Sequence, residues 1–276
     1  MLHEKFILDE RYPDCTLTTY VNNDLPELKM PPRPAIIVCP GGGYRFCSER
    51  EAEPIALHYL SGGLNAFILR YSIKENAKDF APSIEVGLAI KHVRENAEKY
   101  NIDPDRVFTV GFSAGGHLAA SAGVFWNHPT VQEALGDCPE GINRPTGMIL
   151  SYPVITAGPK AHRGSIHRLC GSTEATQEEM DVFSLELHVD ETTPPAFLWH
   201  TFSDTTVPVE NSLLMASALR DHGVPFELHI YPEGPHGLSL CNELTASGRP
   251  HMIVPRAAGW AQLSLEWIKG FKAKEE

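Results

Sequence analysis

Ser113 lies in the middle of the segment GFSAGG (111–116), directly after the strand-like run RVFTV. Glycines on both sides of a serine permit a sharp turn from a strand into a helix, because a Cβ atom would collide there. Such a turn exposes the hydroxyl, and the amino end of the following helix favours developing negative charge. The pattern predicts that Ser113 is a nucleophile, and an ordinary glycine-rich turn is the alternative.

A second glycine-rich segment, PGGGY (40–44), follows the apolar run AIIVC. Consecutive glycines leave backbone N–H groups free and let a ligand approach closely, as an oxyanion hole requires; each such donor is worth about 3 kcal/mol in the transition state. A phosphate-binding turn is the alternative. The segment lacks the Lys-Ser/Thr ending of a P-loop and the G-x-G-x-x-G spacing of a dinucleotide site.

Asp204 in SDTTVP (203–208) and His236 in EGPHG (233–237) each follow a strand-like run. A serine hydroxyl needs an adjacent base to attack at neutral pH, and an imidazole base needs a carboxylate that fixes its tautomer. The chain order Ser, Asp, His is the order in which α/β hydrolases supply these groups. We therefore expect Ser113, His236 and Asp204 to meet.

Other residues with reactive side chains give weaker signals. Asp190, in HVDETTPPAF, is the alternative acid. His200 precedes Asp204 by four residues and is interpreted as a strand-end hydrogen-bonding residue rather than a substitute base. His117, one turn after Ser113, is expected to pack beneath the helix.

Short apolar runs and longer amphipathic segments alternate along the chain, and this alternation must position these residues. The runs are 35–39, 66–71, 107–110, 148–152, 196–199 and 226–231. The helical patterns are 49–61, 82–100, 115–124, 210–222 and 256–271, with Pro82 in a first turn. Buried strands joined by helices predict right-handed crossovers and a three-layer, mainly parallel, doubly wound sheet. We expect one domain over residues 1–276.

Residues 157–190 interrupt this alternation. The segment is polar, is helix-prone near 174–187, and lies between two predicted strands. An insertion there lies above the carboxyl ends of the strands, where ligands bind in such sheets. The segment could serve as a cap over the site or as a surface excursion without contact to substrate. Arg163, His167 and Arg168 are interpreted as solvated surface, with contact to a polar substrate as the alternative.

Composition excludes several classes of function. Lys plus Arg number 23 and Asp plus Glu 35, so the net charge is −12, which argues against nucleic-acid and anionic-lipid binding. No run approaches the roughly 20 apolar residues that span a bilayer. The acidic first residues do not resemble a secretory signal, and six scattered cysteines form no metal-site spacing. We expect a cytoplasmic protein with no metal and no organic cofactor.

Five motifs together resemble the α/β-hydrolases of the esterase/lipase superfamily, in particular the small bacterial acetyl-xylan-esterase-like carboxylesterases. The motifs are PGGGY, LNAFILRYSI, GFSAGGHLAA, PPAFLWHTFSDTTVP and YPEGPHG. The resemblance covers about residues 33–240. It implies the three-layer α/β-hydrolase fold and serine-based hydrolysis.

The resemblance also implies roles for single residues. Ser113 is the nucleophile, His236 the base and Asp204 the orienting acid. The backbone of Ala114 and of Gly42 or Gly43 supplies the oxyanion donors. Pro40 stands where the lipase-type glycine motif has a histidine, so contacts of that imidazole are absent here. Tyr44 and Arg45 follow the glycine loop and are expected to line the acyl or alcohol pocket, with a packing role for Tyr44 as the alternative.

These inferences predict a serine carboxylesterase that hydrolyses short-chain esters, most of all acetyl esters, of small polar alcohols such as acetylated oligosaccharides. An amidase of the same fold, such as an arylformamidase-like enzyme, is the alternative. A second alternative is a ligand-binding protein with the hydrolase fold and no turnover. Such proteins usually lack one of the three residues that correspond here to Ser113, His236 and Asp204. The expected partner is a small-molecule ester, and a homo-oligomer formed through the last helix or residues 1–30 stays open.

Overall fold

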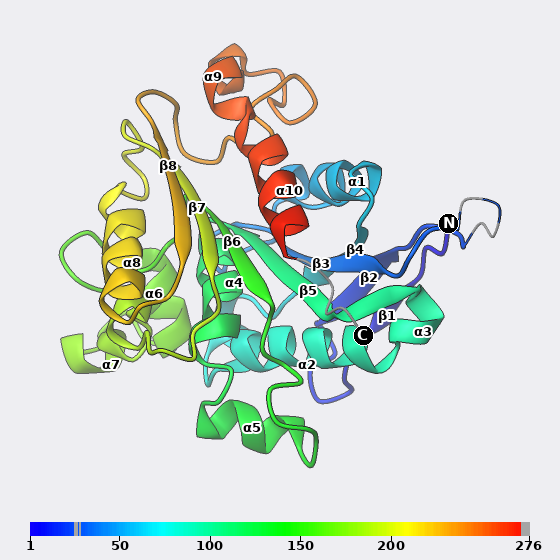
Figure 1. The fold of residues 1–276 in the computed structure, drawn as a ribbon. Helices are drawn as coiled ribbons and strands as arrows, with labels where there is room; N and C mark the ends of the chain where they lie inside the picture. Colours follow the sequence, from blue (N-terminus) through cyan, green and yellow to red (C-terminus); the bar gives the residue numbers. More distant parts are fainter. Residues whose placement is uncertain (25–26, 28, 272–276) are drawn as a thin grey trace.

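Eight strands form one sheet in the computed structural model, which describes residues 1–271 except 25, 26 and 28 (Figure 1). Their spatial order is β1-β2-β4-β3-β5-β6-β7-β8. The strands are β1 (Lys5–Ile7), β2 (Thr16–Tyr20), β3 (Arg33–Cys39), β4 (Asn65–Arg70), β5 (Ile102–Phe112), β6 (Gly147–Ser151), β7 (Ala196–Thr201) and β8 (Phe226–Tyr231). From β4 to β8 all neighbours are parallel, whereas β2 pairs antiparallel with both β1 and β4.

The central strands are apolar along their whole length because both faces of the sheet are covered. In β3, Ile36 and Val38 pack in one core cluster, and Ile37 and Cys39 pack in another on the opposite face. Parallel sheets covered on both sides have this continuous hydrophobic character. The predicted mainly parallel sheet is confirmed. Each of the six predicted runs corresponds to one of the strands β3 to β8, and two of the runs extend one residue past the strand end, at Tyr71 and Tyr152.

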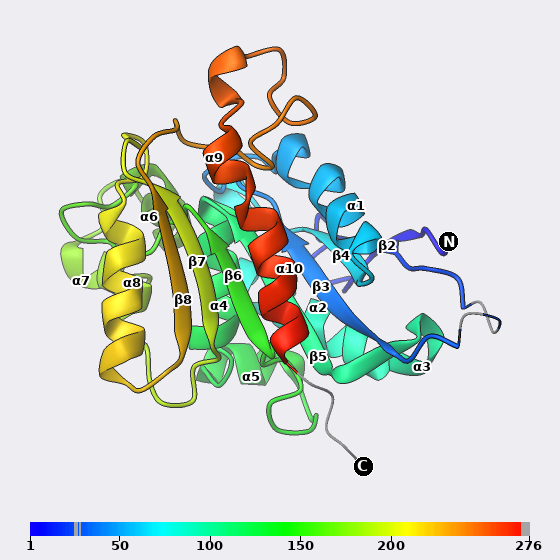
Figure 2. The ribbon, with the colours of Figure 1, turned by 45° about the horizontal axis from the view of Figure 1, so that its top comes forward.

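Helices form the two outer layers (Figure 2). Side chains of α1 and α10 share one core cluster, and those of α2 and α4 share the cluster on the other face. The helices are α1 (Glu53–Ser61), α2 (Ala81–Glu95), α3 (Ala97–Tyr100), α4 (Ala114–Val124), α5 (Pro129–Leu135), α6 (Arg163–Cys170), α7 (Gln177–Asp181), α8 (Glu210–Asp221), α9 (Pro255–Ala258) and α10 (Trp260–Gly270). Among the described residues, no helix combines the length and hydrophobicity of a membrane span.

Three predicted helices are interrupted. The helix expected over 49–61 begins as a 3-10 turn (Glu49–Glu51) before α1. The helix expected over 82–100 ends at Asn96, whose φ of −107° and ψ of 23° separate α2 from α3. The helix expected over 256–271 divides at Gly259 into α9 and α10. Hydrophobic spacing continues across the breaks at Asn96 and Gly259 and therefore conceals them.

The inserted segment follows β6 and precedes β7. It contains α6, α7 and a 3-10 turn (Leu185–Leu187). Phe183 and Leu185 are buried, and the Leu185 N–H donates to the Ile155 carbonyl at 3.1 Å. The segment therefore packs onto the sheet's helical layer as an ordered part of the fold.

Candidate active site

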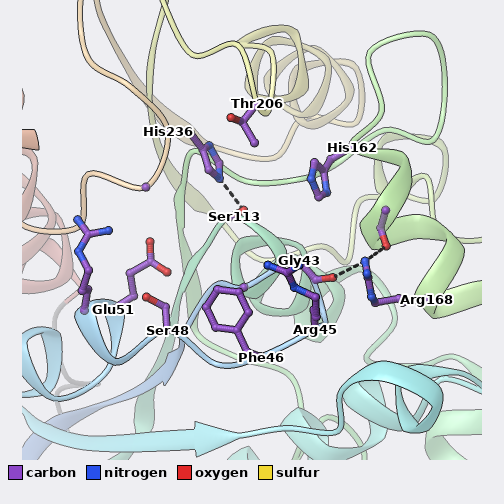
Figure 3. Close-up of a pocket in the computed structure, with 14 residues that line it drawn as sticks. Gly43, Arg45, Phe46, Ser48, Glu51, Ser113, His162, Arg168, Thr206 and His236 are labelled. Atoms are coloured by element: carbon purple, nitrogen blue, oxygen red, sulfur yellow. Dashed lines mark hydrogen bonds between the residues drawn. The ribbon is translucent and has the colours of Figure 1, made fainter. Parts of the chain in front are cut away.

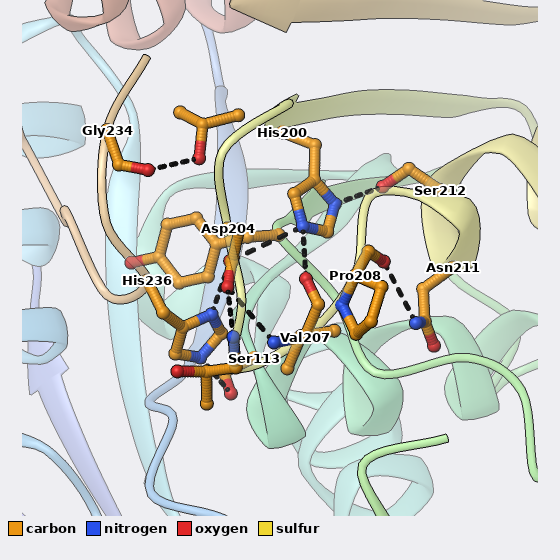
Figure 4. Close-up of polar contacts among 12 residues, drawn as sticks. Ser113, His200, Asp204, Val207, Pro208, Asn211, Ser212, Gly234 and His236 are labelled. Atoms are coloured by element: carbon orange, nitrogen blue, oxygen red, sulfur yellow. Dashed lines mark hydrogen bonds and ion pairs between the residues drawn. The ribbon is translucent and has the colours of Figure 1, made fainter. Parts of the chain in front are cut away.

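Three loops at the carboxyl ends of β5, β7 and β8 bring Ser113, Asp204 and His236 together (Figure 4). His236 Nε2 lies 2.8 Å from Ser113 Oγ, and His236 Nδ1 lies 2.6 Å from Asp204 Oδ2. The three side chains thus form a continuous hydrogen-bond chain. Its ends are 7% exposed at Ser113 and 4% exposed at Asp204, so the chain is shielded from bulk water while the hydroxyl stays reachable.

Ser113 occupies a strained backbone conformation, with φ of 55° and ψ of −117°. The turn is so tight that a Cβ atom on Gly111 would lie 1.9 Å from the Gly115 carbonyl oxygen. A Cβ atom on Gly115 would lie 2.0 Å from the Cys39 carbonyl oxygen. The neighbouring strand β6 keeps Ser113 in this strained backbone conformation, because the Ser113 N–H donates to the Ser151 carbonyl at 3.0 Å.

Asp204 is held as an oriented anion. Its Oδ1 accepts hydrogen bonds from the N–H groups of Thr206 at 2.9 Å and Val207 at 3.0 Å. Burial alone would raise the pKa of Asp204, but hydrogen bonds from His200 and His236 and the charge of His236 outweigh burial and hold that pKa well below its usual value. The ionised carboxylate therefore keeps the Nδ1 proton of His236 in place.

The glycine loop presents backbone donors to the same site. In the described part of the chain, the N–H groups of Gly42 and Gly43 have no hydrogen-bond acceptor, and both residues line the cavity beside Ser113. The Gly41 N–H differs, because it donates to Glu51 Oε2 at 2.9 Å. Ala114 is the first residue of α4, a position whose N–H has no acceptor within its own helix. The predicted oxyanion donors thus border Ser113.

A cavity of about 500 Å³ opens above Ser113 and His236 (Figure 3). Such a volume lies within the usual range for small-molecule sites. The glycine loop supplies Arg45 and Phe46 to its wall, and the inserted segment supplies His162 and Arg168. The insertion therefore contacts the site.

Tyr44 does not line this cavity, although its position after the glycine loop led us to expect it there with Arg45; the alternative packing role applies to it. Its side chain is 1% exposed, and its hydroxyl lies 2.9 Å from His117 Nδ1 beneath the glycine loop. His117 Nε2 in turn donates to the Phe183 carbonyl at 2.9 Å, and burial lowers the pKa of His117 to about 4. Tyr44 and His117 are packing residues, whereas Arg45 lies on the cavity wall.

The structure separates the alternative acid and base from the reacting hydroxyl. Asp190 precedes β7, on the side of the sheet away from the site, and accepts hydrogen bonds from Thr192. His200 Nε2 donates to the Val207 carbonyl at 2.9 Å and lies 3.4 Å from Asp204 Oδ2. His200 therefore supports the carboxylate from behind, as a strand-end hydrogen-bonding residue.

For Arg168 the default interpretation as solvated surface does not hold, because the residue lines the cavity beside Ser113. Its Nη1 donates to the Gly43 carbonyl at 3.2 Å and also to the Gly164 carbonyl, which ties α6 to the glycine loop. His162, which precedes α6, lines the cavity, and Ser165 Oγ lies 2.8 Å from its Nδ1. Burial, with the nearby charges of His236 and Arg168, lowers the pKa of His162.

Glu51 is a site residue that the sequence analysis missed. Besides the Gly41 contact, its Oε1 accepts from the Tyr152 hydroxyl at 2.6 Å. The Tyr152 ring packs edge-on against the His236 ring at a centroid distance of 5.1 Å. The Tyr152 hydroxyl also accepts a hydrogen bond from the Ser239 N–H at 2.9 Å. Glu51 thus connects the glycine loop with the histidine loop. Nothing in its sequence neighbourhood marks it, since its partners are distant in the chain.

No group of three or more His, Cys, Asp or Glu side chains within the described ranges is arranged to hold a metal ion. The chemistry that the arrangement itself supplies is nucleophilic. A hydroxyl, an imidazole and a carboxylate lie in sequence beside unoccupied main-chain donors, and this set suits acyl transfer to serine.

Comparison with known proteins agrees with this geometry. A model of the BD-FAE family matches residues 24–219. Endo-1,4-beta-xylanase B of Butyrivibrio fibrisolvens is 40% identical over 240 residues, which are 84% of this chain and 36% of that protein. Acetylxylan esterase of Xylanibacter ruminicola is 31% identical over 211 residues, 75% of this chain and 41% of that protein. The chain therefore spans well under half the length of these curated relatives.

A solved structure resembles nearly the whole chain. The acetyl ester-xyloside bifunctional hydrolase from Caldicellulosiruptor lactoaceticus superposes with a TM-score of 0.77 at 38% identity. The match covers 93% of this chain and 88% of that one. This chain thus shares most of its fold with a protein described as an acetyl ester-xyloside bifunctional hydrolase.

Proposed function

Because the chain belongs to the BD-FAE family of α/β hydrolases, we propose that it is a serine carboxylesterase that removes acetyl and other short acyl groups from small polar alcohols such as acetylated oligosaccharides. The observation that carries the proposal is the hydrogen-bond chain Ser113–His236–Asp204 beside the free N–H groups of the glycine loop. The names of the relatives that act on acetylated xylan or acetyl esters support the acetyl substrate.

In the proposed reaction, His236 Nε2 takes the Ser113 proton while Oγ attacks the ester carbonyl carbon. The carbonyl oxygen becomes an oxyanion that accepts hydrogen bonds from the N–H groups of Ala114 and of Gly42 or Gly43. His236 then donates its proton to the leaving alcohol, which leaves an acyl group on Ser113. Water attacks this acyl-enzyme with the same imidazole as base and releases the acid. Asp204 stays ionised and stabilises the imidazolium in both halves.

The cavity wall favours a short acyl group and a hydrophilic alcohol. Of the described lining residues, Phe46 has the one large apolar side chain, and the others are glycines or carry polar or charged groups. A long acyl chain needs an extended apolar channel for its methylene groups, each of which gains about 0.8 kcal/mol on burial. A wall of arginine and histidine offers little of this gain.

Hydrolysis of a series of 4-nitrophenyl esters tests the acyl preference. We expect kcat/KM to be highest for acetate or propionate and to fall toward octanoate. Peak rates on octanoate or longer chains would contradict the proposal. Ser113→Ala is expected to lower kcat by several orders of magnitude without changing the unfolding transition, since the residual rate comes from the remaining site alone.

Release of acetate from acetylated xylo-, manno- and cello-oligosaccharides tests the alcohol. We expect Ser113-dependent release from at least one of these at a higher kcat/KM than from 4-nitrophenyl acetate. Faster hydrolysis of N-formylkynurenine than of any acetyl ester would instead identify an amidase that uses the same three residues.

A further inference from the structure

The active-site cavity carries positive charge in a protein whose net charge is −12. Arg45, Arg50 and Arg168 line it, together with His162 (Figure 3). Glu51 is the acidic residue of the wall, and both of its carboxylate oxygens are already engaged, by the Gly41 N–H and by the Tyr152 hydroxyl. Among the described lining residues, three guanidinium groups stand against this one carboxylate, so the net charge of the wall is positive.

A second cavity of about 470 Å³ adjoins the first. The two share Arg45, Gly164 and Arg168 in their walls, so these residues lie on the border between them. Lys74 and His167 add further basic side chains to the second cavity, and Glu75 is its acidic residue. A basic channel thus leads away from Ser113 across the face between the glycine loop and α6.

The cations of this channel lack the ion pairs found elsewhere on the molecule. In the described part of the chain, Arg45, Lys74 and Arg168 form no ion pair, whereas Arg70 pairs with Glu49 at 2.6 Å and Lys160 pairs with Glu210 at 2.6 Å. Neighbouring like charges repel one another, and a cleft lined by one sign of charge attracts ligands of the opposite sign. The unpaired cations are therefore available to a ligand.

We propose that the alcohol part of the substrate carries an anionic group, a carboxylate or a phosphate on a sugar, which binds between Arg45, Lys74 and Arg168 while the ester lies at Ser113. This inference rests on the proposed esterase function and narrows its substrate. Arg45 is suited to the contact because its guanidinium presents paired donors that match carboxylate and phosphate oxygens. Arg168 lines both cavities while its Nη1 group stays bonded to the Gly43 carbonyl.

Three substrates that differ at one position test the proposal. An acetylated disaccharide is prepared with a hydroxymethyl group, a carboxylate or a phosphate ester at C6 of the second sugar. We expect kcat/KM to be roughly tenfold higher for the better anionic form than for the neutral form at low salt, the size expected of one charge-assisted hydrogen bond. The preference is expected to shrink as salt screens the partly exposed cations. The carboxylate and phosphate arms identify the anion.

Variants assign the preference to this channel. Arg45→Gln and Lys74→Gln are each expected to lower the ratio of kcat/KM for the anionic and neutral forms at least threefold. Arg45→Lys is expected to keep part of the preference, because the charge remains while the paired donors are lost. Arg220→Gln is the matched control, since Arg220 is an exposed arginine on α8 that lines neither cavity, and the ratio is expected to stay as in the unmodified protein. An unchanged ratio in both Arg45→Gln and Lys74→Gln overturns the proposal.

Binding to the Ser113→Ala protein separates this proposal from the esterase function. Calorimetry measures the dissociation constants of the deacetylated disaccharides, which involve no turnover. We expect a charged form to bind more tightly than the neutral form. Equal binding together with equal kcat/KM overturns the anion site, even where Ser113-dependent acetate release is intact. Loss of all Ser113-dependent hydrolysis with retained anion binding overturns the esterase function instead.

Discussion

Asp204 determines which nitrogen of His236 carries the proton. Its Oδ2 lies 2.6 Å from Nδ1, so Nδ1 donates and Nε2 is left to accept from Ser113. Asp204→Asn replaces an acceptor with an amide that also donates and thereby favours the wrong tautomer. We expect kcat for acetyl esters to fall on the order of 10⁴-fold. Asp190→Asn, measured alongside, is expected to stay within twofold of the unmodified protein, and the reverse pattern would assign the acid to Asp190.

Glu51 is expected to act as a positioning residue. Its carboxylate holds the Gly41 N–H and the Tyr152 hydroxyl, and thereby fixes the glycine loop relative to the histidine loop. Glu51→Ala leaves both donors without a partner in a buried site, which costs about 1–3 kcal/mol for each group. We expect kcat to fall at least tenfold with a smaller change in KM.

Two further variants distinguish this role from a general loss of stability. Glu51→Gln keeps an acceptor for the Gly41 N–H and is expected to recover much of kcat. Tyr152→Phe removes the other end of the link, so its effect and that of Glu51→Ala are expected to be less than additive in the double variant. Full additivity, or a KM effect larger than the kcat effect, would contradict the positioning role.

At the scale of elements, the turn between β5 and α4 places the nucleophile. Because a Cβ atom on Gly111 would lie 1.9 Å from the Gly115 carbonyl oxygen, Gly111→Ala forces the turn to open. We expect loss of several kcal/mol of unfolding free energy, in the upper range for single substitutions, and near-complete loss of esterase activity. Urea unfolding and 4-nitrophenyl acetate hydrolysis measure the two effects.

Gly259→Ala is the matched control for this turn. Gly259 has a helical φ of −61°, and a Cβ atom there would meet no heavy atom within 4 Å. Alanine reduces the conformational freedom of the unfolded chain at such a position, so we expect a small gain in stability, about 0.5–1 kcal/mol, with unchanged activity. Equal destabilisation by both substitutions would show that the clash at Gly111 is not the cause.

The elements that the sequence predicts well are those whose pattern is local. Strands β3 to β8 are predicted from continuous apolar runs. The position of the site loops is predicted from these strands, because the carboxyl ends of parallel strands lie at one edge of the sheet. Strands β1 and β2 are missed because they owe their order to antiparallel pairing with each other and with β4. Helix breaks at Asn96 and Gly259 are missed because the apolar spacing continues across them.

At the scale of the whole molecule, one buried carboxyl makes stability depend on pH. Glu85 is 0% exposed, and its oxygens accept from the N–H and the hydroxyl of Ser72. Burial raises the pKa of Glu85 to about 7 from 4.5, against the lowering effect of the Ser72 hydrogen bonds. The folded state therefore binds more protons than the unfolded state between these two pH values. This contribution to stability is complete below pH 4.5 and is lost as the pH rises through about 7.

Unfolding of the Glu85→Gln variant at pH 5 and pH 8 checks this dependence. Glutamine stays neutral and can still accept from the Ser72 N–H, so we expect the variant to gain stability relative to the unmodified protein at pH 8, on the order of 3 kcal/mol more than at pH 5. Glu243→Gln, at an exposed position, serves as the control and is expected to show no such difference. A Glu85→Gln effect that is equal at both pH values would contradict the assignment.

The parts of the site that could not be predicted from the sequence are contacts between residues far apart in the chain. Glu51 reaches Tyr152 across 101 positions, and Arg168 reaches Gly43 across 125. Neither residue stands in a motif, and each acquires its place when the glycine loop, the insertion and the histidine loop have packed together. The meeting of Ser113, His236 and Asp204 could be predicted because each lies beside a glycine or proline turn after a strand.

The contact between Arg168 and the Gly43 carbonyl has an evolutionary consequence. Ser113, Asp204 and His236 lie in turns anchored by the sheet, whereas part of the cavity wall (His162, Gly164 and Arg168) lies in one contiguous stretch between β6 and β7. A relative that exchanged this stretch would change the wall beside the site while keeping Ser113, Asp204 and His236 in their turns. Any replacement for this stretch would need a residue that, like Arg168, donates a hydrogen bond to the Gly43 carbonyl.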